Sequence, residues 1–238
     1  MGPASFGYNT PMNRIYLVRH GENLANLTLE FSCRKVDYPL TPKGVLQAQQ
    51  TAAFFRDKGI HEIYASPLLR ARQTAEIIAE AVNLPVTVVE HFREVNVGDL
   101  EGQKPTAALW NQHNRIIDDW RDGKPESCFP GGEDYHSLLG RMKSGLAEIL
   151  AGKKSDRNIV IAGHGGIFTF ALRDLCLDFD RELLKLPMHN CAITELAARG
   201  EGDQMEIRLV SLASTAHLSG EAADFTWKVR DFDEPVAE

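Results

Sequence analysis

The sequence has few of the features that mark secreted, membrane-bound or nucleic-acid-binding proteins. Its four cysteines form no Cys-x-x-Cys pair and no spacing suited to zinc, which argues against a disulfide framework and favours a reducing compartment. No apolar run is long enough to span a bilayer. The 26 Lys and Arg residues against 33 Asp and Glu residues give a net charge of −7, so nothing attracts nucleic acid or an anionic membrane in bulk. We therefore expect a cytoplasmic protein that binds neither, and that holds any anionic ligand with a local cluster of cationic side chains.

The chain is long enough for one sizeable domain. It has 238 residues, of which 43% are hydrophobic, so it can bury a substantial core. Gly, Pro, Asn and Ser crowd the first dozen residues and indicate a flexible leader over 1–12. The remainder, 13–238, is predicted to form a single domain.

Strand-like and helix-like segments alternate along most of this domain. Short apolar runs predict strands at 14–18, 60–66, 86–89 and 158–162. Apolar residues at helical spacing predict helices over 42–55, 68–82, 105–120, 138–150 and 167–177. The stretch 90–102 has no sustained period and is interpreted as a long loop. The alternation predicts a three-layer α/β/α fold with a mostly parallel central sheet.

Two late β-like runs, at 192–198 and 205–212, suit a hairpin or an edge pair. An edge strand presents unpaired backbone groups to a second chain. This pair therefore offers an edge through which a homodimer could form.

Two of the predicted strands end in a histidine beside glycine. The first ends in Arg19-His20-Gly21, and the later one in Gly163-His164-Gly165-Gly166. In a parallel sheet the carboxyl ends of the strands meet at one edge, where ligands bind. The sequence therefore predicts that His20 and His164 converge on one site.

Further blocks lie between these two strand ends. They are Arg19-His20-Gly21-Glu22 with Asn26, Ser66-Pro67-Leu68-Leu69-Arg70-Ala71 with Thr74-Ala75, Arg93-Glu94 with Gly98 and Glu101-Gly102, Pro130-Gly131-Gly132-Glu133, and Gly163-His164-Gly165-Gly166. In this order they resemble the histidine phosphatase superfamily, which has the phosphoglycerate-mutase-like fold. The resemblance runs from about Arg14 to about Asn190 and implies that 13–238 is a catalytic domain.

The resemblance implies a role for each member of a catalytic group. His20 would attack phosphorus and form a phosphohistidine, and its other ring nitrogen would donate to a fixed acceptor such as a backbone carbonyl. Arg19 and Arg70 would bind the phosphate oxygens through bidentate hydrogen bonds. Glu94 would donate a proton to the leaving group, and His164 would add a further donor. Phosphoryl transfer needs these components, and no metal or cofactor is implied.

Other residues are expected to line the same site. Asn26 and the backbone N–H of Gly165 fit supporting roles in phosphate binding. Asn23 and Asn190 are candidates for substrate contacts, and Asn190 matches a position that often borders the pocket in relatives. Arg34 and Lys35 either cover the site and bind a second acidic group or belong to a plain surface loop.

Three functions remain open at this point. The preferred one is a metal-independent phosphatase that acts on a small phosphorylated metabolite. A cofactor-dependent phosphoglycerate mutase is the second, although the interval between Glu94 and His164 is shorter than in those enzymes. The third is a non-catalytic module that binds phosphorylated ligands, but neither the nucleophile nor the acid is missing.

Overall fold

The computed structural model describes residues 12–153, 156–200 and 204–225. Of the predicted leader, 1–11 lie outside the described residues, as do 226–238 of the predicted domain. No helix in the described ranges is long and apolar enough to cross a membrane.

The described residues form one six-stranded sheet with the order β3-β2-β4-β1-β5-β6. Its strands are β1 (Asn13–Arg19), β2 (Glu62–Ala65), β3 (Val86–Val88), β4 (Asn158–Gly163), β5 (Ile193–Arg199) and β6 (Glu206–Ser214). The strands from β3 to β1 in this order run parallel, whereas β5 and β6 are antiparallel to their neighbours. This arrangement confirms the mostly parallel sheet and the late antiparallel pair. Strand β6 lies at the edge of the sheet, as pairing with a second chain would require. The homodimer itself stays a prediction.

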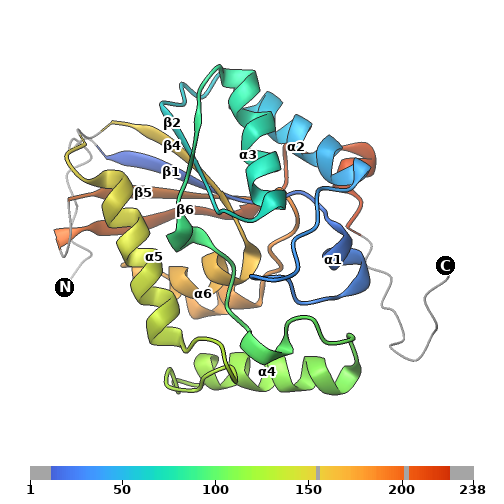
Figure 1. Ribbon diagram of the computed structural model, residues 1–238. Coiled ribbons are helices and arrows are strands. Elements are labelled where there is room, and N and C mark those ends of the chain that lie inside the picture. Colours follow the sequence, from blue (N-terminus) through green and yellow to red (C-terminus); the bar gives the residue numbers. More distant parts are fainter. Residues whose placement is uncertain (1–11, 154–155, 201–203, 226–238) are drawn as a thin grey trace.

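Helices cover both faces of the sheet (Figure 1). On one side lie α2 (Pro42–Phe55) and α3 (Leu69–Val82), and on the other α5 (Tyr135–Leu150) and α6 (Gly165–Leu175). Helix α4 (Ala107–Arg121) lies away from the sheet, at the bottom of Figure 1. The α/β/α layers expected from the sequence are thereby confirmed.

The alternation of side chains along β1 explains why both faces are covered. Ile15 and Leu17 belong to the apolar cluster that includes α5 and α6, whereas Tyr16 and Val18 belong to the cluster that includes α2 and α3. Successive side chains of a strand point to opposite faces. A strand that is apolar at every position is stable only when both faces are buried.

Three local features differ from the sequence prediction. The predicted loop 90–102 contains two short 3₁₀ turns, η1 (Glu90–Phe92) and η2 (Gly98–Leu100). Helix α6 begins at Gly165, inside the predicted glycine-rich loop. The short helix α1 (Leu24–Thr28) was not predicted, because five residues show no helical periodicity. Two more 3₁₀ turns, η3 (Arg181–Lys185) and η5 (Gly220–Ala223), complete the description.

Candidate active site

The register of the sheet brings the two histidine strand ends together. Arg19 of β1 is paired with Gly163 of β4, so His20 and His164 follow the two strands at the same level. Their ring centroids are 5.3 Å apart, and both side chains are buried. The convergence expected from the two strand ends is therefore present.

The hydrogen bonds of His20 define which ring nitrogen carries the proton. Nδ1 lies 2.7 Å from the carbonyl oxygen of Gly21, and Nε2 lies 3.0 Å from Nε of Arg70. A guanidinium can only donate and a carbonyl can only accept. Nδ1 therefore donates to Gly21, and Nε2 accepts from Arg70 with its lone pair directed toward the cation. Burial, with Arg70 and Arg19 nearby, holds the pKa of His20 well below its usual value, so the ring is neutral.

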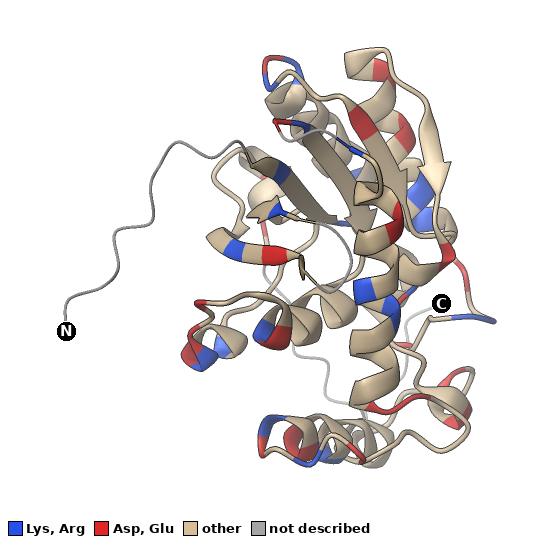
Figure 2. Cartoon of the chain, turned by 90° about the vertical axis from the view of Figure 1, so that its left-hand side faces the viewer, with Lys and Arg blue, Asp and Glu red and all other residues tan. Residues whose placement is uncertain are grey.

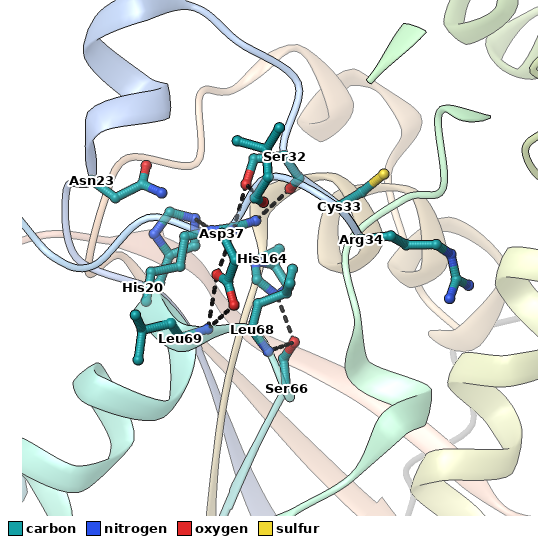
Figure 3. A network of polar contacts seen from close by, with 12 residues as sticks. His20, Asn23, Ser32, Cys33, Arg34, Asp37, Ser66, Leu68, Leu69 and His164 are labelled. Carbon is teal, nitrogen blue, oxygen red and sulfur yellow. Dashed lines mark hydrogen bonds and ion pairs between the residues drawn. The ribbon is translucent and has the colours of Figure 1, made fainter. Parts of the chain in front are cut away.

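Arg70 is fixed by a loop that is distant in sequence. Its Nη1 donates to Oγ of Ser32 and its Nη2 to the carbonyl of Ser32, at 2.9 and 2.7 Å. Asp37 lies 3.7 Å from Nη1 and also accepts from the backbone N–H of Leu69, at the start of α3 (Figure 3). Three groups, the hydroxyl and carbonyl of Ser32 and the carboxylate of Asp37, thus hold the guanidinium next to His20.

Arg19 presents a second cation to the same space. Its Nη1 donates to the carbonyl of Met188, while its buried Nε has no hydrogen-bond partner among the described residues. Burial lowers the pKa of Arg19 to about 10, which still leaves it charged at neutral pH. An unpaired buried N–H of a cation is costly, and Arg19 also lines the cavity, so its guanidinium can bind an anion there.

His164 is held by the strand end next to it. Its Nε2 lies 2.7 Å from Oγ of Ser66, and its buried Nδ1 has no partner in the part of the chain that is described (Figure 3). Burial, followed by the charge of Arg70, keeps the pKa of His164 well below its usual value. The ring is therefore neutral, and one tautomer can present Nδ1–H as a donor while Nε2 accepts from Ser66.

Glu94 lies against the first turn of α6. Its Oε1 accepts from the N–H groups of Val95 and Ile167, at 2.8 and 2.9 Å, and its Oε2 accepts from the N–H of Gly166 at 3.2 Å. The amino end of a helix favours negative charge. Gly166 permits this approach, because a Cβ there would lie 2.7 Å from Oε1 of Glu94.

Three asparagines form the side of the site next to α1. Asn23 and Asn26 make a reciprocal capping box at the start of that helix. Asn190 donates through Nδ2 to the carbonyl of His20 and to Oδ1 of Asn26, both at 3.0 Å. Asn23 and Asn26 line the cavity, whereas Asn190 acts on the backbone of His20. Gly165 packs against Arg19 as the first residue of α6.

The structure does not bring Arg34 and Lys35 to the cavity wall. The Arg34 side chain is about half exposed, lies 4.0 Å from Glu90 and points away from His20 (Figure 3). Neither residue lines the cavity. Their contribution to the site is through the backbone of the loop instead.

Sequence reasoning did not identify what holds this loop. Oε1 of Glu101 accepts from four consecutive backbone N–H groups, 33–36, at 2.7 to 3.1 Å. Oε2 of the same carboxylate lies 3.2 Å from Sγ of Cys33. Burial alone would raise the pKa of Glu101, but the backbone hydrogen bonds outweigh it and the net pKa is lowered. The carboxylate thus fixes the loop that positions Arg70 through Ser32.

Arg141 fixes the segment that carries Glu94, as Glu101 fixes the loop 33–36. It makes a bidentate ion pair with Glu133, and its guanidinium also donates to the carbonyls of His91, Arg93 and Glu94. Glu133 belongs to one of the sequence blocks, but nothing in the sequence indicated that Arg141 of α5 is its partner. Such a partner is set by tertiary structure alone.

His164 is not among the residues that line the cavity of about 230 Å³ onto which the other four catalytic candidates open. Arg19, His20, Arg70 and Glu94 line it together with Asn23, Asn26, Ser32 and Gly166. The rest of the lining is more apolar: Ala25, Glu30, Phe31, Cys33, Val95, Val97, Trp110, His113 and Phe170. The cavity therefore combines a cationic, phosphate-sized end with an apolar one.

Among the described residues there is no group of three or more His, Cys, Asp or Glu side chains that could hold a metal ion. Figure 2 shows acidic and basic residues interspersed over the helices of the face in view. The positive charge that matters is that of Arg19 and Arg70, inside the cavity.

Comparison with known proteins agrees with this geometry. The family model of the histidine phosphatase superfamily (branch 1) matches residues 15–210. The chain therefore belongs to the histidine phosphatase superfamily, as the sequence blocks indicated. The prediction that it is an enzyme of the phosphatase class is confirmed with it.

Individual relatives carry different names within this superfamily. A probable phosphoglycerate mutase from Erwinia tasmaniensis is 33% identical over 192 residues, covering 78% of this chain and 85% of its own. A putative phosphoserine phosphatase 2 from Hydrogenobacter thermophilus is 31% identical over 209 residues, covering 87% and 100%. Among solved structures, a phosphoserine phosphatase mutant from Entamoeba histolytica in complex with phosphoserine has a TM-score of 0.72 at 26% identity, covering 87% of this chain and all of its own.

Proposed function

We propose that this protein is a metal-independent phosphatase that hydrolyses small phosphomonoesters through a phosphohistidine on His20. The observation that carries the proposal is the state of His20. The ring is buried and neutral, with Nδ1–H donated to Gly21 and Nε2 accepting from Arg70 at the wall of a cavity that Arg19 and Glu94 also line. A neutral imidazole with one fixed tautomer is what nucleophilic attack requires.

In the first step, Nε2 of His20 attacks phosphorus as the ester P–O bond breaks. Arg70 turns its N–H groups from Nε2 to the phosphate oxygens, and Arg19 contributes further guanidinium N–H groups from the cavity wall. These donors stabilise the charge that develops on the equatorial oxygens. Glu94 in its protonated form gives its proton to the departing alkoxide, so the alcohol leaves neutral.

In the second step, water hydrolyses the phosphohistidine. Glu94, now ionised, takes a proton from water as the oxygen attacks phosphorus and the P–N bond breaks. Inorganic phosphate leaves, and His20 returns to the neutral state with its proton on Nδ1. The contacts of Glu94 with Gly166 and Ile167 keep the carboxylate in place between the two steps.

The proposal is tested by hydrolysis of p-nitrophenyl phosphate in EDTA. The protein is expected to release phosphate and to carry an acid-labile phosphoryl label after a rapid quench. His20→Ala should lose both, whereas Arg121→Ala on the exposed face of α4 should keep both. Labelling that persists in His20→Ala would falsify the assignment of the nucleophile.

A phosphoglycerate mutase is the second candidate, because the relative from Erwinia tasmaniensis bears that name at 33% identity. A mutase returns the phosphoryl group from His20 to another hydroxyl of the bound molecule. Incubation with 3-phosphoglycerate and 2,3-bisphosphoglycerate separates the two reactions. Isomerisation without phosphate release would favour the mutase, whereas phosphate release alone favours hydrolysis.

A further inference from the structure

The substrate cavity has two chemically different walls. The phosphate end lies at the sheet edge, where Arg19 ends β1 and His20 follows it. The opposite wall includes Trp110 and His113 of α4, a helix that lies away from the sheet (Figure 1). Phe31 packs against both of these rings, with centroids at 4.6 and 4.9 Å. The alcohol part of a bound ester therefore faces aromatic side chains.

The charges of the lining leave no cation for a second acidic group. Arg19 and Arg70 are its two cationic side chains, and both face the phosphate position. Burial lowers the pKa of His113, so this ring is neutral and adds no charge. A phosphomonoester is close to a dianion at neutral pH, and it would use both arginines. A carboxylate on the same substrate would share the cavity with Glu30 and find no free counter-charge in the lining.

Glu30 places an acidic side chain in the aromatic wall of the cavity. It lines the cavity between Leu29, whose carbonyl accepts from Nε1 of Trp110, and Phe31. Its Oε2 is buried and has no hydrogen-bond partner in the described ranges. The Tyr38 hydroxyl interacts with the same carboxylate, which raises the pKa of Tyr38. A buried carboxylate oxygen without a donor is costly, and a cation bound beside the carboxylate offsets part of that cost.

Aromatic rings beside a carboxylate with one unpartnered oxygen form a site for a cation with an apolar surface. The faces of Trp and Phe attract ammonium groups, and Glu30 supplies the opposite charge. We propose that the preferred substrates are phosphomonoesters of short alcohols that bear an amine or quaternary ammonium group, with the cation bound at Glu30, Phe31 and Trp110. This inference rests on the proposed phosphatase function and adds the substrate class.

The decisive comparison uses two esters of the same shape. Choline phosphate carries a quaternary ammonium group, and 3,3-dimethylbutyl phosphate replaces its nitrogen with carbon. The wild-type enzyme should hydrolyse choline phosphate with a kcat/KM about tenfold or more above that of the neutral ester, since a desolvated cation–π contact is commonly worth about that factor. Equal kcat/KM values for the two esters would overturn the inference.

Substitution of Glu30 then tests the assignment to this residue. In Glu30→Gln the ratio of kcat/KM for the two esters should fall to near one, and kcat/KM for 3-phosphoglycerate should rise, because a negative charge has been removed. A substitution that only disturbs the fold would lower all three values together. Glu126→Gln, an exposed change outside the cavity lining, should leave the ratio at the wild-type value. An unchanged ratio in Glu30→Gln would contradict the assignment.

A measurement on the wild-type protein covers the case in which Glu30→Gln does not fold. Choline should inhibit p-nitrophenyl phosphate hydrolysis competitively at concentrations about tenfold below those needed for 3,3-dimethylbutanol. Equal inhibition by the two alcohols would overturn the inference alone, with the phosphatase intact. Absence of hydrolysis for every ester would overturn the proposed function and this inference with it.

Discussion

The Nε–H of Arg70 donates to Nε2 of His20 across 3.0 Å, although the two residues lie fifty positions apart in the chain. The contact joins a buried cation to the proposed nucleophile and helps to keep the imidazole neutral. It also places the guanidinium where the phosphate oxygens would lie during attack.

The first prediction concerns pH. Because the pKa of His20 is lowered by burial and then by Arg70, the neutral nucleophile should persist well below pH 6.5, and the acid limb of kcat/KM should lie on that side. Arg70→Gln removes one of these causes, so its acid limb should move to higher pH. The ionisation of p-nitrophenyl phosphate is the same for both enzymes and cancels in the comparison. Coinciding acid limbs would show that Arg70 does not set this pKa.

The second prediction concerns the shape of the Arg70 side chain. Arg70→Lys keeps the charge but cannot bond His20 and Ser32 at the same time, because lysine lacks the planar fork. We expect kcat/KM to fall by about 10²- to 10³-fold. Arg121→Lys, which alters an exposed ion pair on α4, is the matched control and should change kcat/KM less than twofold or so. A fall of similar size in both variants would refute a specific role for Arg70.

The third prediction concerns Glu101, which acts on the site only through the loop 33–36. Glu101→Gln weakens four backbone hydrogen bonds to one buried carboxylate, and we expect a loss of roughly 1–3 kcal/mol in the free energy of unfolding by urea. The pKa of Glu101 is lowered from 4.5, so its ionised form stabilises the fold fully above that pH. The difference between wild type and variant should shrink as pH falls through the lower, folded-state pKa.

Kinetics separate this positioning role from a general loss of stability. Glu101→Gln and Ser32→Ala both act on Arg70 through the same loop. Their effects on kcat/KM should therefore be less than additive in the double variant. Fully additive effects would mean that Glu101 does not act through Ser32. Glu126→Gln serves as the control for loss of an acidic side chain elsewhere.

The fourth prediction concerns Gly166. Alanine there would place a Cβ 2.7 Å from Oε1 of Glu94 and 2.9 Å from Cγ2 of Val95, so the carboxylate must move. A displacement of about 1 Å can cost up to about 10²-fold in rate, and we expect kcat to fall by at least about tenfold. Gly140→Ala on α5 meets nothing within 4 Å and should leave kcat unchanged while stabilising the helix slightly. An unaltered kcat in Gly166→Ala would mean that Glu94 is not the proton donor.

The parts of the site that the sequence predicted follow from local rules. Each of β1 and β4 is an apolar run that stops at a histidine, and a parallel sheet collects such ends at one edge. The proline after Thr41 and the glycine after the next apolar stretch bounded α2 closely. The apolar spacing over 68–82 placed Arg70 in the first turn of a helix, and α3 begins one residue before it.

The parts that escaped prediction depend on contacts between distant segments. Glu30 had no signal, because its unpaired oxygen matters only beside Trp110 and Phe31. Glu101 belonged to a recognised block, but its role required knowing that the backbone of the loop 33–36 lies against it. Arg34 could not be excluded from the cavity until its side chain was seen to point away.

The sequence by itself determined the layers of the fold, the two strand ends and the group of residues able to transfer a phosphoryl group. It did so because side-chain periodicity and strand termination are local properties of the chain. Only the tertiary structure decided the tautomer of His20, the support of Arg70 by Ser32, and the charge of the wall opposite the phosphate end. These depend on distances of a few ångströms between segments separated by tens of residues, which burial and sheet register set together.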